Sequence, residues 1–299
     1  MVISIIGTNG LLATELGLFC NQNQISIKAF GRNKPITYSY NEFEMVDLLH
    51  EQINIDKILD SNIIFYTAGA GIQSNLDDSE VSIYQLNTFI PIHLCKELSK
   101  KGFNGTFVTF GSCFEIGNND KSVLFSEKEV VCASLDVPND YCISKRLLTR
   151  YVTSDKKVFK HLHIVLPTIY GEKEAPHRLI PYVVTSIKNN KPMQFTQGLQ
   201  VRQYLYVGDI PAIVFDLISL SKEGVFNISG TETFSVRQII EMIYKFYGLE
   251  ISEELFGKAE RADVGMLNLQ LDDSELKKIL REVKYTRFID SLKIYDKCL

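Results

Sequence analysis

A tyrosine and a lysine near the middle of the chain have a spacing that could support proton transfer. Tyr141 and Lys145 stand four residues apart in the stretch YCISK, just before a run with helical spacing. On a helix such residues share a face, so we expect the Lys145 ammonium to lie near the Tyr141 phenol and to lower its pKa from about 10. A tyrosine tuned in this way can give a proton to a carbonyl, or take one from an alcohol, at neutral pH. Ser112 ends a strand-like segment 29 residues earlier, and its hydroxyl could bind the same oxygen.

A glycine-containing turn follows the first apolar run of the chain. Gly7 and Gly10 lie in GTNGLLA (7–13), directly after VISII. The first glycine would allow a tight turn, the second would let the backbone approach a pyrophosphate, and small Ala13 would let the next helix pack closely on the strand. The amides and the dipole of that helix's N-terminus would hold the phosphates. The pattern therefore predicts dinucleotide binding at this turn.

The end of the next apolar run bears on the choice of cofactor. An NAD-binding fold usually has an acidic residue about 20 residues after the glycines, to bind the ribose 2′-hydroxyl. The corresponding stretch, IKAFGRNKP, offers Gly31, Arg32 and Asn33 and no acid. A guanidinium at this place suits the 2′-phosphate of NADP. We therefore favour NADP(H) as cofactor, with NAD(H) possible.

These residues need elements to position them, and the first half of the chain alternates short apolar runs with helix-like segments. Continuous β-branched runs between helical patterns indicate a parallel sheet covered on both faces, hence a Rossmann-type, doubly wound α/β fold. The pattern becomes less regular after Pro167, although FSVRQIIEMIYKFYG (234–248) predicts a helix with Ser235 as N-cap. We expect a smaller C-terminal substrate-binding region there. The predicted strands are 2–6, 26–30, 62–68, 105–112 and 163–167, and the predicted helices of the first half are 11–20, 41–52 and 82–100.

Bulk properties narrow the class of protein. A chain of 299 residues can bury ample core, and a net charge of -4 without a long basic tract argues against nucleic-acid binding. The six cysteines have no CxxC spacing, so we expect reduced thiols in a cytosolic protein and no metal site. The opening residues do not resemble a signal peptide, and no window reaches about 18 uninterrupted apolar residues, the length of a membrane span. We expect a cytoplasmic protein that acts on a small molecule away from membranes.

In combination, these motifs resemble the extended short-chain dehydrogenase/reductases, specifically the branch that acts on nucleoside-diphosphate sugars. By that resemblance Gly7, Asn9, Gly10 and Leu11 belong to a cofactor loop, and Asn87 in YQLNTF braces the active site and contacts the cofactor. Ser112, Tyr141 and Lys145 match the family's catalytic triad, whose tyrosine and lysine also contact the cofactor. The resemblance covers nearly the whole chain.

Later blocks resemble the same family in their expected order: LPTIYG (166–171), RLIP (178–181), VRQYLYVGDI (201–210), FNISG (226–230) and RADV (261–264). The resemblance implies substrate contacts for Thr168, Arg178, Arg202 and Arg261, with Arg202 and Arg261 gripping the diphosphate through their guanidinium forks. It divides the chain into a dinucleotide-binding part, 1–166 plus about 200–228, and a nucleotide-sugar-binding part, about 167–199 plus 229–299. A homodimer is possible.

Some positions depart from the family pattern. The dehydratases of the family carry an Asp-Glu pair just after the triad hydroxyl, whereas this chain has Cys113 and Phe114, with Glu115 one place too far along. Dehydration is therefore disfavoured. We expect Cys113 to be a packed thiol and His177 a loop residue near the pocket rim, although both residue types serve a branch that combines epimerisation with reduction. His161 and His163 are expected to be solvated or capping residues.

Three hypotheses for function remain. The leading one is NADPH-dependent reduction of a nucleoside-diphosphate 4-keto-6-deoxyhexose to the 4-hydroxy sugar. The nearest alternative is a nucleotide-sugar 4-epimerase that uses tightly bound NAD. A non-catalytic dinucleotide-binding regulator is the third.

Overall fold

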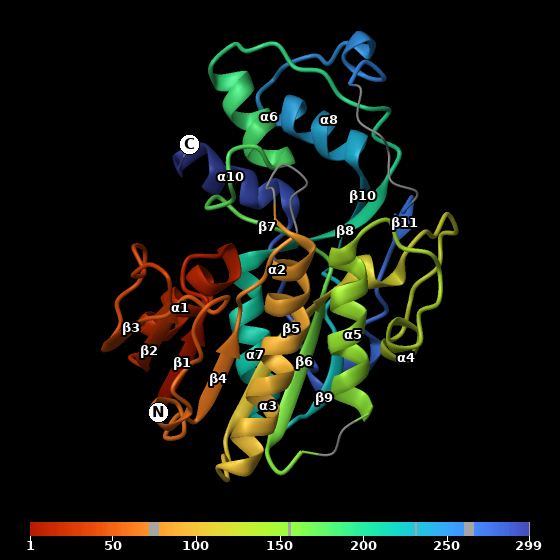
Figure 1. Ribbon diagram of the computed structural model, residues 1–299. Coiled ribbons are helices and arrows are strands. Elements are labelled where there is room, and N and C mark those ends of the chain that lie inside the picture. The colour runs from red at the N-terminus through yellow and green to blue at the C-terminus, as the bar shows by residue number, and fades with distance from the viewer. Residues whose placement is uncertain (72–77, 155–156, 231, 260–265, 299) are drawn as a thin grey trace.

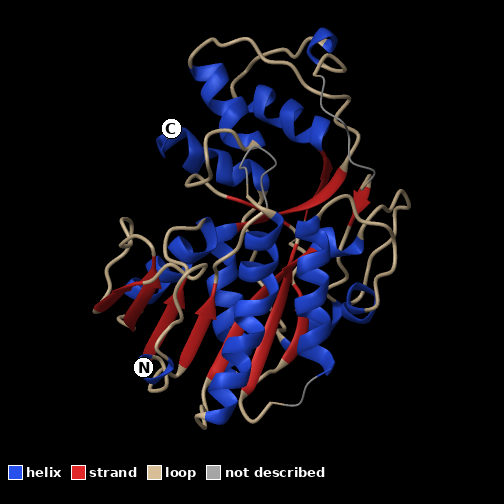
Figure 2. Cartoon of the chain, in the orientation of Figure 1, coloured by secondary structure: helices blue, strands red, loops and turns tan. Residues whose placement is uncertain are grey.

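The computed structural model describes residues 1–71, 78–154, 157–230, 232–259 and 266–298. It contains a large parallel sheet flanked by helices, and a smaller sheet beside which three further helices pack (Figures 1 and 2). The expected Rossmann-type α/β fold is confirmed.

The large sheet has seven strands, all paired in parallel, in the order β3-β2-β1-β4-β5-β6-β9. This order starts with β1 in the interior of the sheet and adds strands first toward one edge and then toward the other. The carboxyl ends of β1, β2 and β5 consequently lie along one edge, which is where doubly wound sheets bind their ligands. The strands are β1 Val2–Ile6, β2 Ser26–Gly31, β3 Glu42–Met45, β4 Ile63–Tyr66, β5 Thr106–Ser112, β6 Lys160–Leu166 and β9 Gly224–Asn227.

Side chains on opposite faces of the large sheet pack into two separate apolar cores. Ile63 and Phe65 of β4 pack into the core beneath α1 and α7, whereas Ile64 and Tyr66 pack into the core beneath α3. Successive side chains of a strand point to opposite faces, so a strand that is apolar at every position is buried on both sides. The helices of this layer are α1 Leu11–Gln22, α2 Glu80–Tyr84, α3 Ile90–Lys100, α4 Glu127–Val131, α5 Asp140–Ser154, α7 Ile210–Ser219 and α9 Ser274–Ile279; a π-helical turn, Gln85–Phe89, joins α2 to α3.

The second sheet is built around one central strand. β8 pairs with β10 in antiparallel fashion and with β7 and β11 in parallel. Three helices share an apolar core with it, and the N-terminus of α8 is closed by the capping box of Ser235 and Gln238, as the sequence predicts for Ser235. The elements are β7 Thr168–Tyr170, β8 Val201–Tyr206, β10 Glu232–Ser235, β11 Asn268–Leu269, α6 Leu179–Lys188, α8 Val236–Phe246 and α10 Phe288–Cys298.

The chain passes repeatedly between the two sheets. It leaves the large sheet after β6, builds β7, α6 and β8 in the second unit, returns for α7 and β9, and then leaves again for β10 and α8. An ion-pair link also joins the two, since Lys173 Nζ lies 2.8 Å from Glu15 Oε1 of α1 and 2.7 Å from Glu172 Oε1.

Two expectations differ from the structure. The helix expected at 41–52 is wrong, because Glu42–Met45 forms the edge strand β3 and pairs with β2. This edge strand is short and half polar, and its apolar residues together with those that follow it have a spacing similar to that of a helix. The segment from 201 to 206 was expected in the dinucleotide-binding part but forms β8 of the second sheet, while α9, expected in the other part, packs against the large sheet through Leu276.

Candidate active site

The glycine turn lies at the carboxyl end of β1. Gly7 has φ +94°, and a Cβ at this position would lie 2.6 Å from the amide nitrogen of Ala68, so the turn needs a glycine. Gly10 is the N-cap of α1 and supplies no side-chain hydrogen bond to the first helical amides. A Cβ at Gly10 would meet no atom within 4 Å, so open space lies in front of the helix N-terminus, where Leu11 begins the helix. Unsatisfied amides facing open space suit an anion such as a dinucleotide pyrophosphate.

The residues after β2 complete this loop. The Thr8 hydroxyl donates to the carbonyl of Asn33 at 2.7 Å, and the amide of Asn9 donates to the carbonyls of Asn33 and Lys34 at 3.2 Å. The side chain of Asn9 therefore ties the glycine turn to the end of β2. Arg32 follows β2 directly and is exposed, so its guanidinium is accessible beside the turn.

Asn87 connects the loop after β4 to α5. It is 1% exposed in the π-helical turn, and its amide exchanges hydrogen bonds of 2.9 and 3.0 Å with the backbone of Ala70. The same amide donates to the Ser144 hydroxyl at 3.0 Å, and Ser144 donates to the carbonyl of Tyr141 at 2.8 Å. Asn87 thus supports the helical turn that carries Tyr141. The bracing function expected from the sequence agrees with these bonds, while cofactor contact stays a prediction.

Ser112 ends β5 in a turn that its own sequence stabilises. Its hydroxyl accepts from the amide of Phe114 at 3.3 Å, and its amide donates to Glu115 Oε1 at 2.7 Å, which together form a capping box. Cys113 is fully buried, and burial raises the pKa of its thiol to about 12. Cys113 is therefore a packed thiol, as expected. The Glu115 carboxyl is also fully buried, inside the protein rather than on the exposed side of the turn.

The Tyr141 phenol lies between Ser112 and Lys145. The Ser112 hydroxyl is close enough to the phenol to lower its pKa, and the Lys145 ammonium lies 5.9 Å from the centre of the Tyr141 ring. The same ammonium donates to the carbonyl of Phe110 at 2.9 Å, which holds it under the end of β5. The three residues of the expected triad are thus brought together by the end of β5 and the first turns of α5 (Figure 1).

One electrostatic expectation for this group is wrong. Burial raises the pKa of Tyr141 above its usual value of 10, and hydrogen bonding to Ser112 offsets this only in part. Burial also lowers the pKa of Lys145 to about 8, because a buried ammonium loses hydration. Desolvation of the phenol is therefore the largest influence on its pKa. Tyr141 begins as a neutral phenol that can donate a proton.

The two histidines of β6 are not solvated or capping residues, as had been expected. His161 and His163 are buried, and both accept or donate at the Thr109 hydroxyl, at 2.8 and 2.7 Å. Burial lowers the pKa of His163 to about 3 and that of His161 well below its usual value, so both rings are neutral. Residues i and i+2 of a strand face the same side, so the sequence places both rings together but does not report their burial between β5 and β9.

The residues expected to hold the sugar nucleotide lie around the second sheet. Thr168 begins β7, and Arg178 is the N-cap residue of α6 and pairs with Glu174 at 3.1 Å. Arg202 of β8 is buried; its guanidinium donates to the carbonyls of residues 201, 266 and 267 and lies 5.7 Å from the ring of Phe114. His177 is exposed in the loop before α6. Arg261 lies outside the described residues. Substrate contacts by these side chains stay predictions.

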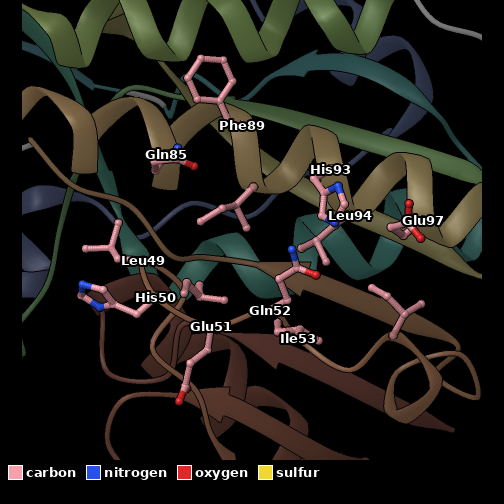
Figure 3. Close-up of a pocket in the computed structure, with 13 residues that line it drawn as sticks. Leu49, His50, Glu51, Gln52, Ile53, Gln85, Phe89, His93, Leu94 and Glu97 are labelled. Carbon is pink, nitrogen blue, oxygen red and sulfur yellow. The ribbon is translucent and has the colours of Figure 1, made fainter.

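A pocket of about 570 Å³ lies between the segment after β3 and the helix formed by the π-helical turn and α3 (Figure 3). His50 and Gln52 line one side, and Phe89, His93 and Glu97 line the other. Ser112, Tyr141 and Lys145 do not line it. The pocket is therefore separate from the triad.

The described part of the chain has neither a metal-binding cluster nor a membrane-spanning helix. No group of three or more His, Cys, Asp or Glu side chains there could hold a metal ion. No helix among those residues has the length and apolar character needed to cross a bilayer.

Comparisons with solved structures agree with the fold. The UDP-glucose 4-epimerase of Thermotoga maritima, solved with UDP-glucose, has a TM-score of 0.80 at 17% identity and covers 99% of each chain. An NAD-dependent NDP-hexosamine 5,6-dehydratase of tunicamycin biosynthesis, TunA, has a TM-score of 0.84 at 15% identity and covers 100% of this chain and 97% of its own. At these identities the likeness shows the fold.

Sequence relatives share shorter regions. A dTDP-D-glucose 4,6-dehydratase of Dictyostelium discoideum is 28% identical over 198 residues, 63% of this chain and 44% of that protein. A CDP-abequose synthase of Salmonella muenchen is 30% identical over 91 residues, 28% of this chain and 30% of that protein. The matched regions thus span less than half the length of either relative. The profile described as "NAD dependent epimerase/dehydratase family" matches residues 3–229. This chain therefore belongs to the NAD-dependent epimerase/dehydratase family, whose members are extended short-chain dehydrogenase/reductase enzymes.

Proposed function

We propose that the protein reduces a nucleoside-diphosphate 4-keto-6-deoxyhexose to the 4-hydroxy sugar, with NADPH as reductant. The observation that carries this proposal is the assembly of Ser112, Tyr141 and Lys145 in one protein with an open glycine turn and an exposed Arg32. The triad supplies acid–base chemistry at an oxygen, the turn suits a dinucleotide, and the arginine suits the 2′-phosphate of NADP.

The triad residues have distinct roles in this reaction. The bound NADPH would supply a hydride to C4 of the sugar. Ser112 would orient the C4 carbonyl oxygen through its hydroxyl, and Tyr141, a neutral phenol, would donate its proton to that oxygen as negative charge develops there. Lys145 would stabilise the resulting phenolate with its ammonium, which is charged below about pH 8. The neutral phenol carries the proton that the reduced carbonyl oxygen requires.

The substrate's diphosphate would bind away from the reacting carbon. Arg202 and Arg261 are the guanidinium groups that the resemblance assigns to it. Arg178 is a third candidate, since it is partly exposed at the N-terminus of α6 and anions are stabilised at such a position. Arg202 would contribute to the same region, although its guanidinium also holds the carbonyls of residues 266 and 267. Binding energy from this remote group would serve to position the ketone.

The direct test is an assay with purified protein, NADPH and nucleoside-diphosphate 4-keto-6-deoxyhexoses. Steady oxidation of NADPH with formation of one 4-hydroxy sugar supports the proposal, and Tyr141→Phe should abolish it. A nucleotide-sugar 4-epimerase would instead interconvert two hexoses without net change in cofactor, and that result would replace the proposal. The relatives named as epimerases support this alternative equally well. If Tyr141→Phe changed no activity while cofactor still bound, a non-catalytic regulator would be the better description.

A stability screen would identify the ligands. A ligand that binds only the native state raises the free energy of unfolding. The screen compares NADPH and NADH, each combined with UDP, GDP, CDP or dTDP. The cofactor and nucleotide that together raise the free energy of unfolding most are the ligands of the protein. A larger increase with NADH than with NADPH would contradict the role assigned to Arg32.

We also propose a homodimer formed through the face of α2 and α5. These helices contact each other, and the Tyr84 hydroxyl of α2 bonds to Asp140 of α5 at 2.8 Å. Large apolar side chains remain exposed on and between them: Val81, Phe89, Ile143 and Leu147. Exposed apolar side chains on neighbouring helices are typical of an interface. Sedimentation of the wild type should give a dimer that Leu147→Glu converts to a monomer; a wild-type monomer at all concentrations would contradict it.

A further inference from the structure

A buried carboxyl and two buried histidines lie behind the triad, and the proposed reaction uses none of them. Glu115 has no exposed surface, and its Oε1 accepts from the amide of Ser112 at 2.7 Å. Its other oxygen, Oε2, has no partner that meets hydrogen-bond geometry among the described residues. The Thr149 hydroxyl is among the groups that lower the pKa of this carboxyl, but it forms no hydrogen bond with Oε2.

From Thr149 a line of polar groups continues into the sheet. The Thr149 hydroxyl lies 2.8 Å from His163 Nε2, and His163 Nδ1 lies 2.7 Å from the Thr109 hydroxyl. Thr109 in turn lies 2.8 Å from His161 Nε2, and His161 Nδ1 lies 3.6 Å from the Cys95 sulfur. The line thus runs from α5 through β6 and β5 to α3.

Gly111 makes room for the head of this line. A Cβ at this position would lie 2.6 Å from Glu115 Oε1 and 2.7 Å from His163 Nε2. Any other residue at the penultimate position of β5 would collide with both groups. The carboxyl and the imidazole therefore occupy one shared space beneath the end of β5, next to the residue that bears the triad hydroxyl.

Proton counting gives the line a direction. Each hydroxyl has one proton to donate, and each neutral imidazole has one N–H. The Thr149 hydroxyl donates to the carbonyl of Lys145 at 3.2 Å, so its oxygen accepts from His163 Nε2–H, His163 Nδ1 accepts from Thr109, and Thr109 accepts from His161 Nε2–H. Thr149 then has no second proton for Glu115, and only a neutral acid, with Oε2–H, could donate toward it. If Glu115 is ionised, a buried carboxylate oxygen without a geometric partner must carry negative charge, which is strongly unfavourable.

We propose that Glu115 is a positioning residue that holds a proton: Oε1 fixes the Ser112 turn, and protonated Oε2 heads the buried line through Thr149 and His163. A carboxylic acid kept neutral by its surroundings can donate a hydrogen bond at neutral pH. This inference rests on the proposed function in that the triad is the group being positioned.

Neutral Glu115 also matters for the charges around it. The titratable and charged groups that face it are Tyr141, Cys142, Lys145 and Arg146 of α5, Cys113 of its own turn and His163 of β6. Burial raises the pKa of Glu115, while Lys145 and Arg146 lower it. A carboxylate here would raise the pKa of Tyr141 and would itself attract the ammonium of Lys145. A neutral acid leaves that ammonium to act on the phenol.

The first test needs no turnover. Infrared difference spectra of wild type minus Glu115→Gln at neutral pH should contain the carbonyl band of a protonated carboxylic acid. A matched control is Glu129→Gln, because Glu129 occupies the same position in the exposed capping box of Ser126, where hydrogen bonds lower the pKa of its carboxyl. Its difference spectrum should contain carboxylate bands only. Carboxylate bands alone for Glu115 would overturn the proposal.

The second test separates positioning from charge. Glu115→Gln keeps an acceptor for the Ser112 amide and a donor for Thr149, so kcat should stay within about threefold of wild type. Glu115→Leu removes the acceptor, lets the Ser112 turn shift, and should lower kcat by about a hundredfold with little change in KM. An equal loss with both variants would contradict the proposal. If the wild type reduces no substrate, the proposed function fails, while the infrared result still decides the state of Glu115.

Discussion

The two glycines of the turn after β1 should respond to alanine in opposite ways. Gly7 has φ +94°, and its α-carbon faces the backbone of Ala68; Gly10 has φ -74° and faces open space. Gly7→Ala should therefore damage the fold, whereas Gly10→Ala should spare the fold and damage cofactor binding. The contrast depends on the phosphates lying in the open space before α1.

The magnitudes follow from these environments. At Gly7 a left-handed backbone costs an alanine about 1–2 kcal/mol, and a Cβ 2.6 Å from a backbone nitrogen adds an overpacking cost of about 1–3 kcal/mol. The free energy of unfolding should fall by about 2–5 kcal/mol. At Gly10 an alanine makes the unfolded chain stiffer, which raises the free energy of unfolding by about 0.4–1 kcal/mol. Alanine is also a poorer N-cap than glycine, so the net change in the free energy of unfolding is about zero. A methyl group in the phosphate space should weaken cofactor binding at least about tenfold, which is about 1.4 kcal/mol.

Urea unfolding with and without NADPH measures both effects. At a cofactor concentration of about 100 times the wild-type Kd, the wild type should gain about 2.7 kcal/mol of unfolding free energy, and a variant that binds tenfold more weakly should gain about 1.4 kcal/mol. Gly10→Ala should show wild-type stability without cofactor and the smaller gain with it. If Gly10→Ala keeps the full gain, the phosphates do not lie at this helix N-terminus, and the assignment of the turn is refuted.

Three further predictions concern the triad and the cofactor. Tyr141→Phe should lower kcat by about 10²- to 10⁴-fold, because the phenol proton is lost, while isothermal titration shows that the cofactor still binds. Arg32→Ala should weaken NADPH binding by about 1.5–3 kcal/mol relative to NADH, as expected when a charged hydrogen bond is removed; Lys34→Ala, in the same loop, should not change that ratio. Since the Lys145 pKa is about 8, its ammonium is present below that pH and lost above it, so the pH profile of kcat should decline on the alkaline side; a flat profile to pH 10 would contradict this.

The sequence was sufficient for the five strands β1, β2, β4, β5 and β6 and for the position of the triad, whereas β3 and β9 were missed. Strands such as Ile63–Tyr66 are apolar at every position, which only burial on both faces explains. The four-residue spacing of Tyr141 and Lys145 places both on the turns of α5 that face the end of β5. Both inferences depend on local periodicity, which a single sequence displays.

The electrostatics could not be predicted in the same way. The ammonium of Lys145 does lie near Tyr141, yet the pKa of the phenol is raised because the surrounding chain removes water from it. Likewise, the apolar run of the sequence predicts a strand only from 163, whereas β6 begins at Lys160 and places the rings of His161 and His163 beneath α3 and α5. Burial depends on distant segments, and composition alone does not report it.

The passage of the chain back and forth between its two sheets has a consequence for stability. Cutting the chain after residue 229 would remove β10 and β11 and leave both sides of β8 short of partners, and it would strip α9 from the large sheet. Exposed strand edges of this kind invite aggregation. Neither unit can be expressed alone as a continuous fragment, and heat or denaturant should unfold both in a single cooperative transition. Chimaeras that exchange substrate specificity between relatives would therefore need to replace several separated segments at once.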